Sequence, residues 1–448
     1  MHGKKISVAF PAVVFLALIL GTGPALAGPT YVLFTTIPVP PSPDNNVAGA
    51  KFTLYDISFF DANTQLDYLA DRSNASIDIF SAKTNTFVGR IGGTGNLFVG
   101  IQPPPPSGQP AVNDISGPDG VVVVNLPGQH QVWAGDGFST LKGFDLNNGN
   151  AALPNTPIAT GTPPNPIPIP LPITPLTNLG DKRVDEMAFD PTGQRLLVAN
   201  NAADTPFATL INTTNNTIAK KIVFDGTNNT PIATNGIEQA VWDPGTQRFY
   251  LSIPEIGCTG GPGKGPGCNP GGVAVIKADG TVEKTFDLAA FGITACSPAG
   301  LAVGKASQLL VGCGVASQTI LLDPTANSGS GSIKTISQVS GEDMVWFDPT
   351  TNRFFVAARL DPSGPVLGII DAATGTWLQN VRTSPGAHSV AVDPVSGEVF
   401  VPFGGVAGNT LCPNGCIAVF GIPEPSSLLL LAAGLIGLGG LGWRRRHR

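Results

Sequence analysis

A short pattern recurs along the middle of the chain: an apolar stretch ends in Asp-Pro, a turn follows, and a second apolar stretch comes next. The clearest units hold the Asp-Pro pairs that begin at Asp190, Asp243, Asp348 and Asp393. Asp accepts hydrogen bonds from its own backbone and Pro presets φ for a turn. Apolar stretches of four or five residues joined by such turns indicate antiparallel strands. The pattern predicts a repeated β-meander and assigns these aspartates to turns.

Three weaker units, which begin near Leu54, Gly120 and Ala299, bring the count to seven. With 56 Gly and 42 Pro in 448 residues, long helices are not expected. Sheets repeated radially at this scale form a propeller, which hides strand edges by closing a circle. We predict an all-β fold, a seven-bladed β-propeller of four-stranded antiparallel blades over residues 28–421. The alternative, a two-sheet sandwich, does not explain the repeat.

Two further features belong to this prediction. The last unit shows only three strands, so an early strand at 31–36 would supply the fourth and close the ring. The proline-rich stretch 153–176 would form an exposed loop.

The N-terminal residues have the layout of a secretory signal peptide. Lys4 and Lys5 precede an apolar run, and small residues stand before a cleavage site after Ala27. A retained membrane anchor is the alternative, but the run is short for a span and Gly-Pro follows at once. We expect signal peptidase to remove residues 1–27 and the body to be exported.

The C-terminal residues contain three elements in order, a Pro-Glu-Pro motif, an apolar run at 427–443 and an arginine cluster. The run is at the short limit for a transmembrane helix, and the arginines would hold its end in the cytoplasm. The motif residues are Pro423, Glu424 and Pro425, and the arginines are Arg444, Arg445 and Arg446.

This segment, 422–448, resembles the PEP-CTERM sorting signal. The resemblance implies that an exosortase cuts near Pro-Glu-Pro, that the helix first holds the precursor in the inner membrane, and that the body then reaches the cell envelope, outer surface or extracellular matrix. A plain tail anchor, the alternative, would not need the Pro-Glu-Pro motif. The body would therefore contact the membrane only through the terminal helix.

The charge of the body excludes some partners. The chain has 25 Lys and Arg against 31 Asp and Glu, a net charge of −6. Six of those basic residues lie in the two terminal segments, so the body has a net charge near −12. An acidic body argues against nucleic acid or anionic lipid as a ligand and permits cations.

The six cysteines all lie in the predicted exported body, where an even number indicates disulfides. Zinc is the competing interpretation, but the spacing lacks a Cys-x-x-Cys pair. Many pairings are open. We favour nearest neighbours, namely Cys258 with Cys268, Cys296 with Cys313, and Cys412 with Cys416.

Two motifs in the repeats resemble known propeller families. The Gly-Pro-Asp-Gly stretch at 117–120 and the Pro-Ala-Gly stretch at 298–300 resemble the inner-strand openings of gluconolactonase-like (SMP-30) proteins. The Asp-Pro-x-x-x-Arg units resemble YVTN repeats. These motifs specify a fold far better than an activity.

One position of the repeat is titratable in six of seven units. It lies five residues before the Asp-Pro aspartate, and the fifth unit has Ala299 there. The first strand of a propeller blade lines the central channel, so these residues should converge at the channel mouth. They are Asp56, Asp119, Asp185, Glu238, Asp343 and His388.

Converging carboxylates suit Ca²⁺ or a similar divalent cation, and an imidazole also suits a transition metal. The gluconolactonase resemblance implies one divalent ion here that polarises a lactone carbonyl. His388 is the best candidate for proton transfer. The plainer interpretation is that these residues hydrate a wet channel.

Two functions remain open from the sequence. The first is a surface or matrix platform that binds exopolysaccharide or surface proteins, with one divalent cation as the only expected cofactor. The second is a metal-dependent hydrolase of lactones or esters with the channel mouth as its active site.

Overall fold

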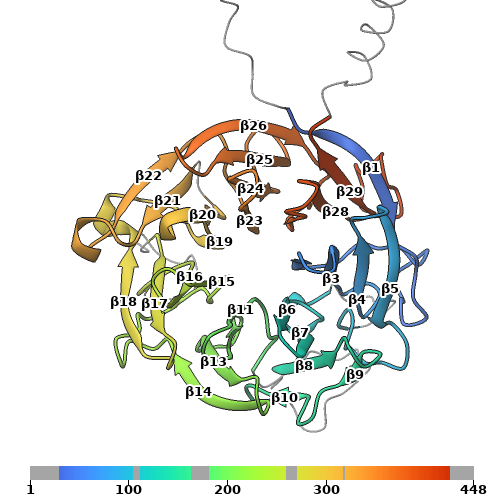
Figure 1. The fold of residues 1–448 in the computed structure, drawn as a ribbon, viewed down its shortest axis with the longest axis horizontal. Coiled ribbons are helices and arrows are strands. Elements are labelled where there is room, and N and C mark those ends of the chain that lie inside the picture. The colour runs from blue at the N-terminus through green and yellow to red at the C-terminus, as the bar shows by residue number, and fades with distance from the viewer. Residues whose placement is uncertain (1–29, 104–110, 163–180, 259–269, 316–317, 424–448) are drawn as a thin grey trace, which may run out of the picture.

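A computed structural model of the chain describes residues 30–103, 111–162, 181–258, 270–315 and 318–423. Seven antiparallel sheets lie in a ring around a central channel, with the first strand of each sheet innermost (Figure 1). The predicted all-β, seven-bladed propeller is therefore confirmed. The predicted signal peptide, the proposed transmembrane helix 427–443 and the three arginines lie outside the described residues.

The blades follow one another along the chain. Blade 1 contains β2 (Ser58–Asp61), β3 (Leu66–Asp71), β4 (Ser76–Ser81) and β5 (Thr86–Gly92). Blade 2 contains β6 (Val121–Leu126), β7 (Gln129–Asp136), β8 (Thr140–Asp145), β9 (Ala151–Ala152) and β10 (Ile158–Ala159). Blade 3 contains β11 (Met187–Asp190), β12 (Arg195–Asn200), β13 (Phe207–Asn212) and β14 (Thr217–Val223).

The second half of the ring repeats this order. Blade 4 contains β15 (Ala240–Asp243), β16 (Arg248–Ile253), β17 (Gly272–Lys277) and β18 (Val282–Asp287). Blade 5 contains β19 (Pro298–Val303), β20 (Leu309–Cys313), β21 (Thr319–Asp323) and β22 (Ser332–Ile336). Blade 6 contains β23 (Val345–Asp348), β24 (Arg353–Ala358), β25 (Val366–Asp371) and β26 (Thr376–Arg382).

Blade 7 joins the two ends of the propeller. It contains β27 (Ala391–Val392), β28 (Val399–Phe403) and β29 (Cys416–Gly421), and its outer strand is β1 (Val32–Pro38). Strand β1 pairs antiparallel with β29, as the sequence predicted. Each sheet is complete within the described part of residues 30–423, so the propeller needs no strand from either terminal segment.

Four short 3₁₀ helices lie in the described connections. They are η1 (Asn113–Ile115), η2 (Leu288–Phe291), η3 (Lys305–Ser307) and η4 (Asn327–Gly329). No helix among the described residues is long and apolar enough to cross a membrane.

The Asp-Pro turns have the predicted chemistry. The carboxylate of Asp190 accepts a hydrogen bond from the Thr192 backbone N–H at 2.8 Å, and that of Asp243 accepts one from the Gly245 N–H at 2.9 Å. The residue four places after each aspartate has positive φ, and in blade 7 it is a glycine, Gly397. This left-handed residue lets the chain enter the second strand directly.

The hydrophobic core lies within and between the blades. The largest cluster joins blades 1, 2, 6 and 7, and includes Ile77, Val132, Phe355 and Val401, all fully buried. Strand β10 pairs with β8, and Leu153 and Ile158 are buried. Within the proline-rich stretch, Ile158 and Ala159 therefore add a short strand to blade 2 and Leu153 is buried, whereas Pro154, Asn155 and Pro157 are exposed. Residues 163–176 lie outside the described chain.

Two of the favoured disulfides are present, Cys296–Cys313 and Cys412–Cys416. Cys258 is also disulfide-bonded. Its expected partner, Cys268, lies outside the described residues. The first bond joins the segment before β19 to the last residue of β20, and the second joins the loop before β29 to the first residue of β29.

Candidate functional site at the channel mouth

The six titratable residues precede the inner strands of their blades. Five of them stand two residues before the strand begins, as Asp185 does before Met187, whereas His388 stands three residues before Ala391. Radial repetition brings them to one end of the channel. Five line a cavity of about 380 Å³, which we call the mouth cavity. Its acidic, arginine and histidine lining residues are Asp56, Arg72, Arg183, Asp185, Glu186, Glu238, Asp343, Arg359 and His388.

Asp119 does not line the mouth cavity but is linked to it by an ion pair with Arg72. Arg72 forms buried ion pairs with both Asp56 and Asp119, and its Nε donates to Asp119 Oδ1 at 2.6 Å. Burial raises the pKa of Asp119 to about 7, although the positive charges of Arg72 and Arg183 oppose that shift. Blades 1 and 2 are therefore joined at the mouth by one guanidinium between two carboxylates.

Two further arginines neutralise carboxylates of other blades. Arg183 Nη2 lies 2.6 Å from Asp185 Oδ2, and Arg359 Nη1 lies 2.8 Å from Asp343 Oδ2. Burial lowers the pKa of Arg183, but the neighbouring Asp185 and Asp119 carboxylates more than reverse this, so it stays charged. The carboxylates at the mouth are therefore not all free to bind a cation.

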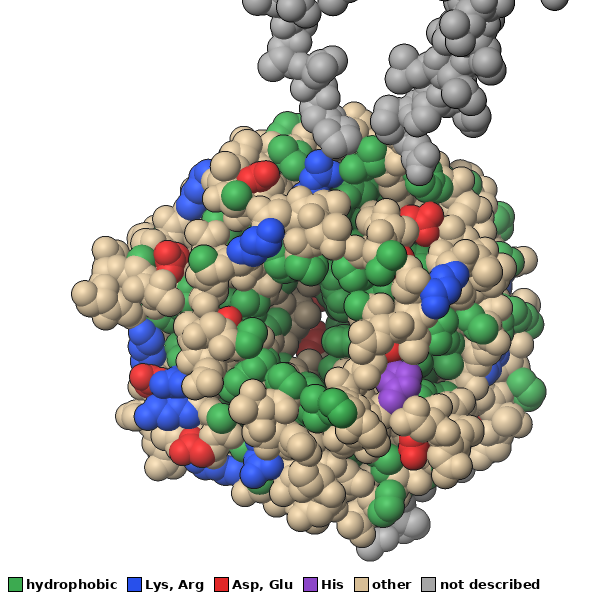
Figure 2. All heavy atoms as spheres, viewed as in Figure 1, with side chains coloured by type: hydrophobic (Ala, Val, Ile, Leu, Met, Phe, Trp, Pro, Cys, Tyr) green, Lys and Arg blue, Asp and Glu red, His purple; other side chains and the backbone are tan. Residues whose placement is uncertain are grey.

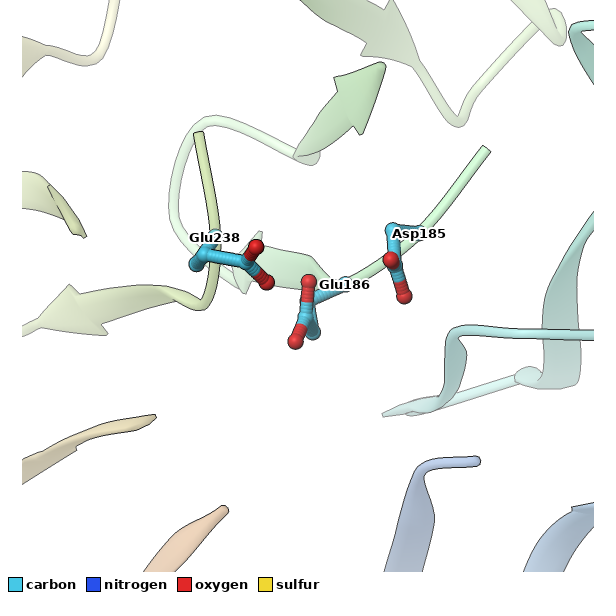
Figure 3. A group of neighbouring side chains, drawn as sticks. All are labelled: Asp185, Glu186 and Glu238. Carbon is cyan, nitrogen blue, oxygen red and sulfur yellow. The ribbon is translucent and has the colours of Figure 1, made fainter. Parts of the chain in front are cut away.

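Three carboxylates nevertheless form a close group, which we call the carboxylate trio. Asp185, Glu186 and Glu238 each offer an oxygen, and the three oxygens lie within 4.8 Å of one another (Figure 3). Asp185 Oδ1 and Glu186 Oε2 are buried and accept no hydrogen bond from any described residue. Such orphaned buried oxygens are costly, so the trio has unused capacity to bind a cation.

The electrostatics of the trio follow from burial and repulsion. Burial and the negative charges of Asp185 and Asp343 raise the pKa of Glu238 to about 8. Burial and repulsion from Asp185 raise the pKa of Glu186 well above its usual range. A cation would replace these protons with a more favourable partner, and its other ligands would be water or backbone oxygens.

His388 lines the same cavity, and contacts with neighbouring residues fix the position of its ring. Its ring stacks on Tyr55 with centroids 4.6 Å apart, and its Nδ1–H donates to the Gly386 carbonyl at 2.6 Å. Burial lowers its pKa to about 4, so the ring is neutral at neutral pH. Its Nε2 is 3.7 Å from Asp56 Oδ1. This nitrogen can therefore accept a proton or a hydrogen bond.

Sequence reasoning missed Glu186 and the three arginines. In an antiparallel hairpin, the end of the second strand lies beside the start of the first. Arg72 and Arg359 directly follow β3 and β24, and therefore reach the mouth from the second strand. The same position in blade 3 is Asn201, whose Nδ2 donates to Asp185 Oδ2 at 2.6 Å. This pairing rule was the signal that could have found Arg72 and Arg359, whereas Arg183 and Glu186 lie in the segment that precedes β11.

Comparison with known proteins bears on the C-terminus. Residues 421–446 match the PEP-CTERM protein-sorting motif. The chain carries a PEP-CTERM sorting signal. This motif indicates export through an exosortase to the cell surface. Within the PEP-CTERM segment, Pro423 belongs to the described residues, and Glu424 and Pro425 lie beyond them.

The comparisons do not identify the propeller itself. No curated protein matches the sequence. One solved structure with a similar backbone is Kuenenia stuttgartiensis hydrazine synthase, at 11% identity and a TM-score of 0.47, with 73% of this chain and 83% of that chain covered.

Proposed function

We propose that this PEP-CTERM protein is an exported binding module of the cell surface or extracellular matrix, whose channel mouth holds one divalent cation on the carboxylate trio. The observation that carries this proposal is the closeness of Asp185, Glu186 and Glu238, with two buried oxygens that lack a donor. Oxygen-only ligands of this kind favour Ca²⁺ or another hard cation. Residues 1–27 would be removed by signal peptidase during export.

The cation would act as a stabiliser of the channel mouth. Asp185 and Glu186 belong to blade 3 and Glu238 to blade 4, so a shared ion would join neighbouring blades. The exposed rim of the propeller would then serve as a rigid surface for exopolysaccharide or other surface proteins. Of the six candidate ligands from the sequence, Asp56, Asp119 and Asp343 pair with arginines and lie outside the trio. Asp185 pairs with Arg183 through Oδ2, but its Oδ1 has no donor among the described residues, so we assign the ion to the trio alone.

A metal-dependent hydrolase of lactones or esters is the second candidate. Its support is the neutral His388, which lines the cavity that contains the trio. In that function, the ion would polarise a carbonyl and His388 would accept a proton from water.

One experiment separates these functions. The propeller, residues 30–423, is produced in an oxidising compartment, its metal content is measured by mass spectrometry, and a lactone and ester panel is assayed with and without chelator. Bound calcium without turnover supports the binding module, whereas chelator-sensitive turnover that His388→Gln abolishes supports the hydrolase. Absence of metal at native purity and after calcium addition would refute both.

A further inference from the structure

The opposite end of the channel contains a second cavity of about 520 Å³, which we call the aromatic cavity. It runs along the inner strands, from their first residues, such as Val121 and Met187, to the residues that lead into the Asp-Pro turns. Five half-buried aromatic side chains from blades 1, 3, 4 and 6 line it, with aliphatic side chains between them. They are Phe59, Phe189, Trp242, Trp346 and Phe347.

Such a concave apolar surface indicates a ligand site. Hydrophobic side chains surround the central opening on one face of the molecule, and an acidic side chain is visible deep inside (Figure 2). Soluble proteins seldom leave a large apolar patch exposed without a function, and the volume suits a small organic molecule. Phe59 and Trp346 meet edge to face with centroids 5.5 Å apart, so part of the wall is pre-formed.

Glu186 lines both the aromatic cavity and the mouth cavity, so this residue lies where the two cavities meet. The residue is 7% exposed, and its Oε2 accepts no hydrogen bond from the described chain. The other acidic residue on the aromatic cavity, Asp61, is already satisfied by His130 at 3.0 Å and Asn125 at 3.1 Å. Glu186 is therefore the acceptor that a ligand in this cavity would meet.

The charge of the cavity selects the ligand. None of its described lining residues is Lys or Arg, whereas the three arginines of the site lie on the mouth cavity. An anionic ligand would find no Lys or Arg among the described lining residues, only neutral donors such as the unpaired Trp242 Nε1–H, and would be repelled by the trio. A cation would be attracted by the negative faces of the aromatic rings, and its charge would favour the ionised form of the buried Glu186 carboxyl, to which it can donate a hydrogen bond.

We propose that the aromatic cavity binds an organic ammonium ion whose apolar ring packs among Trp242, Trp346 and Phe59 and whose ammonium donates to Glu186. This site overlaps the divalent-cation site of the proposed function at Glu186 but does not require that ion. The two share Glu186, so a divalent ion on the trio would compete with the ammonium.

The test uses three probes of the same shape: tryptamine carries an ammonium, tryptophol a hydroxyl and indole-3-acetate a carboxylate. Binding to the propeller is measured by calorimetry in chelator, which removes divalent ions. We expect tryptamine to bind at least about tenfold more tightly than tryptophol, as for a charge-assisted hydrogen bond, and indole-3-acetate not to bind. Glu186→Gln should reduce tryptamine to the affinity of tryptophol.

Matched variants keep the test specific. Trp346→Leu should weaken both tryptamine and tryptophol, whereas Trp377→Leu, on the outer strand β26, should change neither. If Glu186→Gln does not fold, Glu186→Asp moves the carboxylate back and should lower the preference for tryptamine. Equal affinities for tryptamine and tryptophol, a preference that survives Glu186→Gln, or no binding at millimolar concentration would overturn the proposal.

Calcium binding by the trio and ammonium binding in the aromatic cavity can be tested separately. Glu238 lines the mouth cavity and not the aromatic cavity. Glu238→Gln should therefore abolish calcium binding and keep the preference for tryptamine over tryptophol. Loss of that preference in Glu238→Gln would mean that the ammonium is held at the mouth, and would overturn its assignment to the aromatic cavity.

Discussion

Arg183 Nη2 lies 2.6 Å from Asp185 Oδ2, and Nη1 of the same guanidinium lies 3.9 Å from both Asp56 Oδ2 and Asp119 Oδ1. One arginine side chain thus stands among carboxylates of three successive blades. Its position explains how a propeller can gather six carboxylates at one channel end without excessive repulsion. The arginines neutralise Asp56, Asp119 and Asp343 and pair with one oxygen of Asp185, whereas Glu186 and Glu238 form no ion pair with a described arginine.

Arg183→Gln should lower the free energy of unfolding by about 3 kcal/mol, because it leaves buried carboxylates without their cation. Added calcium should stabilise this variant more than the wild type, since the trio becomes more negative. The measurement is urea unfolding with and without calcium.

Arg248→Gln is the matched control for that variant. Arg248 pairs with Glu283 at 2.7 Å, but both side chains are about a third exposed. Its loss should cost no more than about 1 kcal/mol and should not respond to calcium. Equal effects of the two substitutions would contradict the assigned role of Arg183.

The sequence predicts the ring better than its chemistry. Asp190 and Asp243 mark the turns directly, and one fixed step back from each gives Asp185 and Glu238 at the mouth. The fold follows because turn residues and strand periodicity are local signals. Which carboxylates stay unpaired depends on Arg72 and Arg359, which come from the neighbouring strand and are not repeated in every blade. That pairing is tertiary, so the repeat alone could not predict it.

Asp67→Asn should make the stability of the protein less dependent on pH. Asp67 is fully buried, neither of its carboxylate oxygens has a hydrogen-bond partner among the described residues, and burial raises its pKa well above the usual range. The folded state therefore holds this proton more tightly than the unfolded state, so its contribution to stability is complete below about pH 4 and is lost as pH rises through the folded pKa.

The check is urea unfolding of wild type and Asp67→Asn between pH 4 and 8. The free energy of unfolding of the wild type should fall more steeply with pH, by up to about 1.4 kcal/mol per pH unit. Parallel curves for the two proteins would show that Asp67 does not titrate in this range.

Gly120→Ala should disturb the channel mouth, because the added methyl group clashes with the backbone of the next blade. A Cβ at Gly120 would collide with the backbone carbonyl of Asp185. A Cβ at Gly300 would collide in the same way with the backbone carbonyl of Asp343. The neighbouring blade must move, which should cost about 1–3 kcal/mol and weaken calcium binding. Gly89→Ala is the control, because a Cβ there has open space. A Gly120→Ala protein as stable as Gly89→Ala would refute this close approach.

The two described disulfides should differ in their contribution to stability. Cys296 and Cys313 are 17 residues apart, and Cys412 and Cys416 are 4 apart. Loop-closure entropy predicts a loss of about 3 kcal/mol for the first pair and about 2 kcal/mol for the second when each is replaced by serines. Thermal unfolding of the two double variants checks this order, which the reverse ranking would contradict.

The most direct measurement is anomalous diffraction from crystals of the propeller grown with Mn²⁺, a hard divalent cation. Our account predicts one strong peak within about 2.5 Å of carboxylate oxygens from Asp185, Glu186 and Glu238, and its loss in Glu238→Gln crystals. A trio without a peak, in crystals whose channel mouth is otherwise ordered, would contradict the proposed cation site.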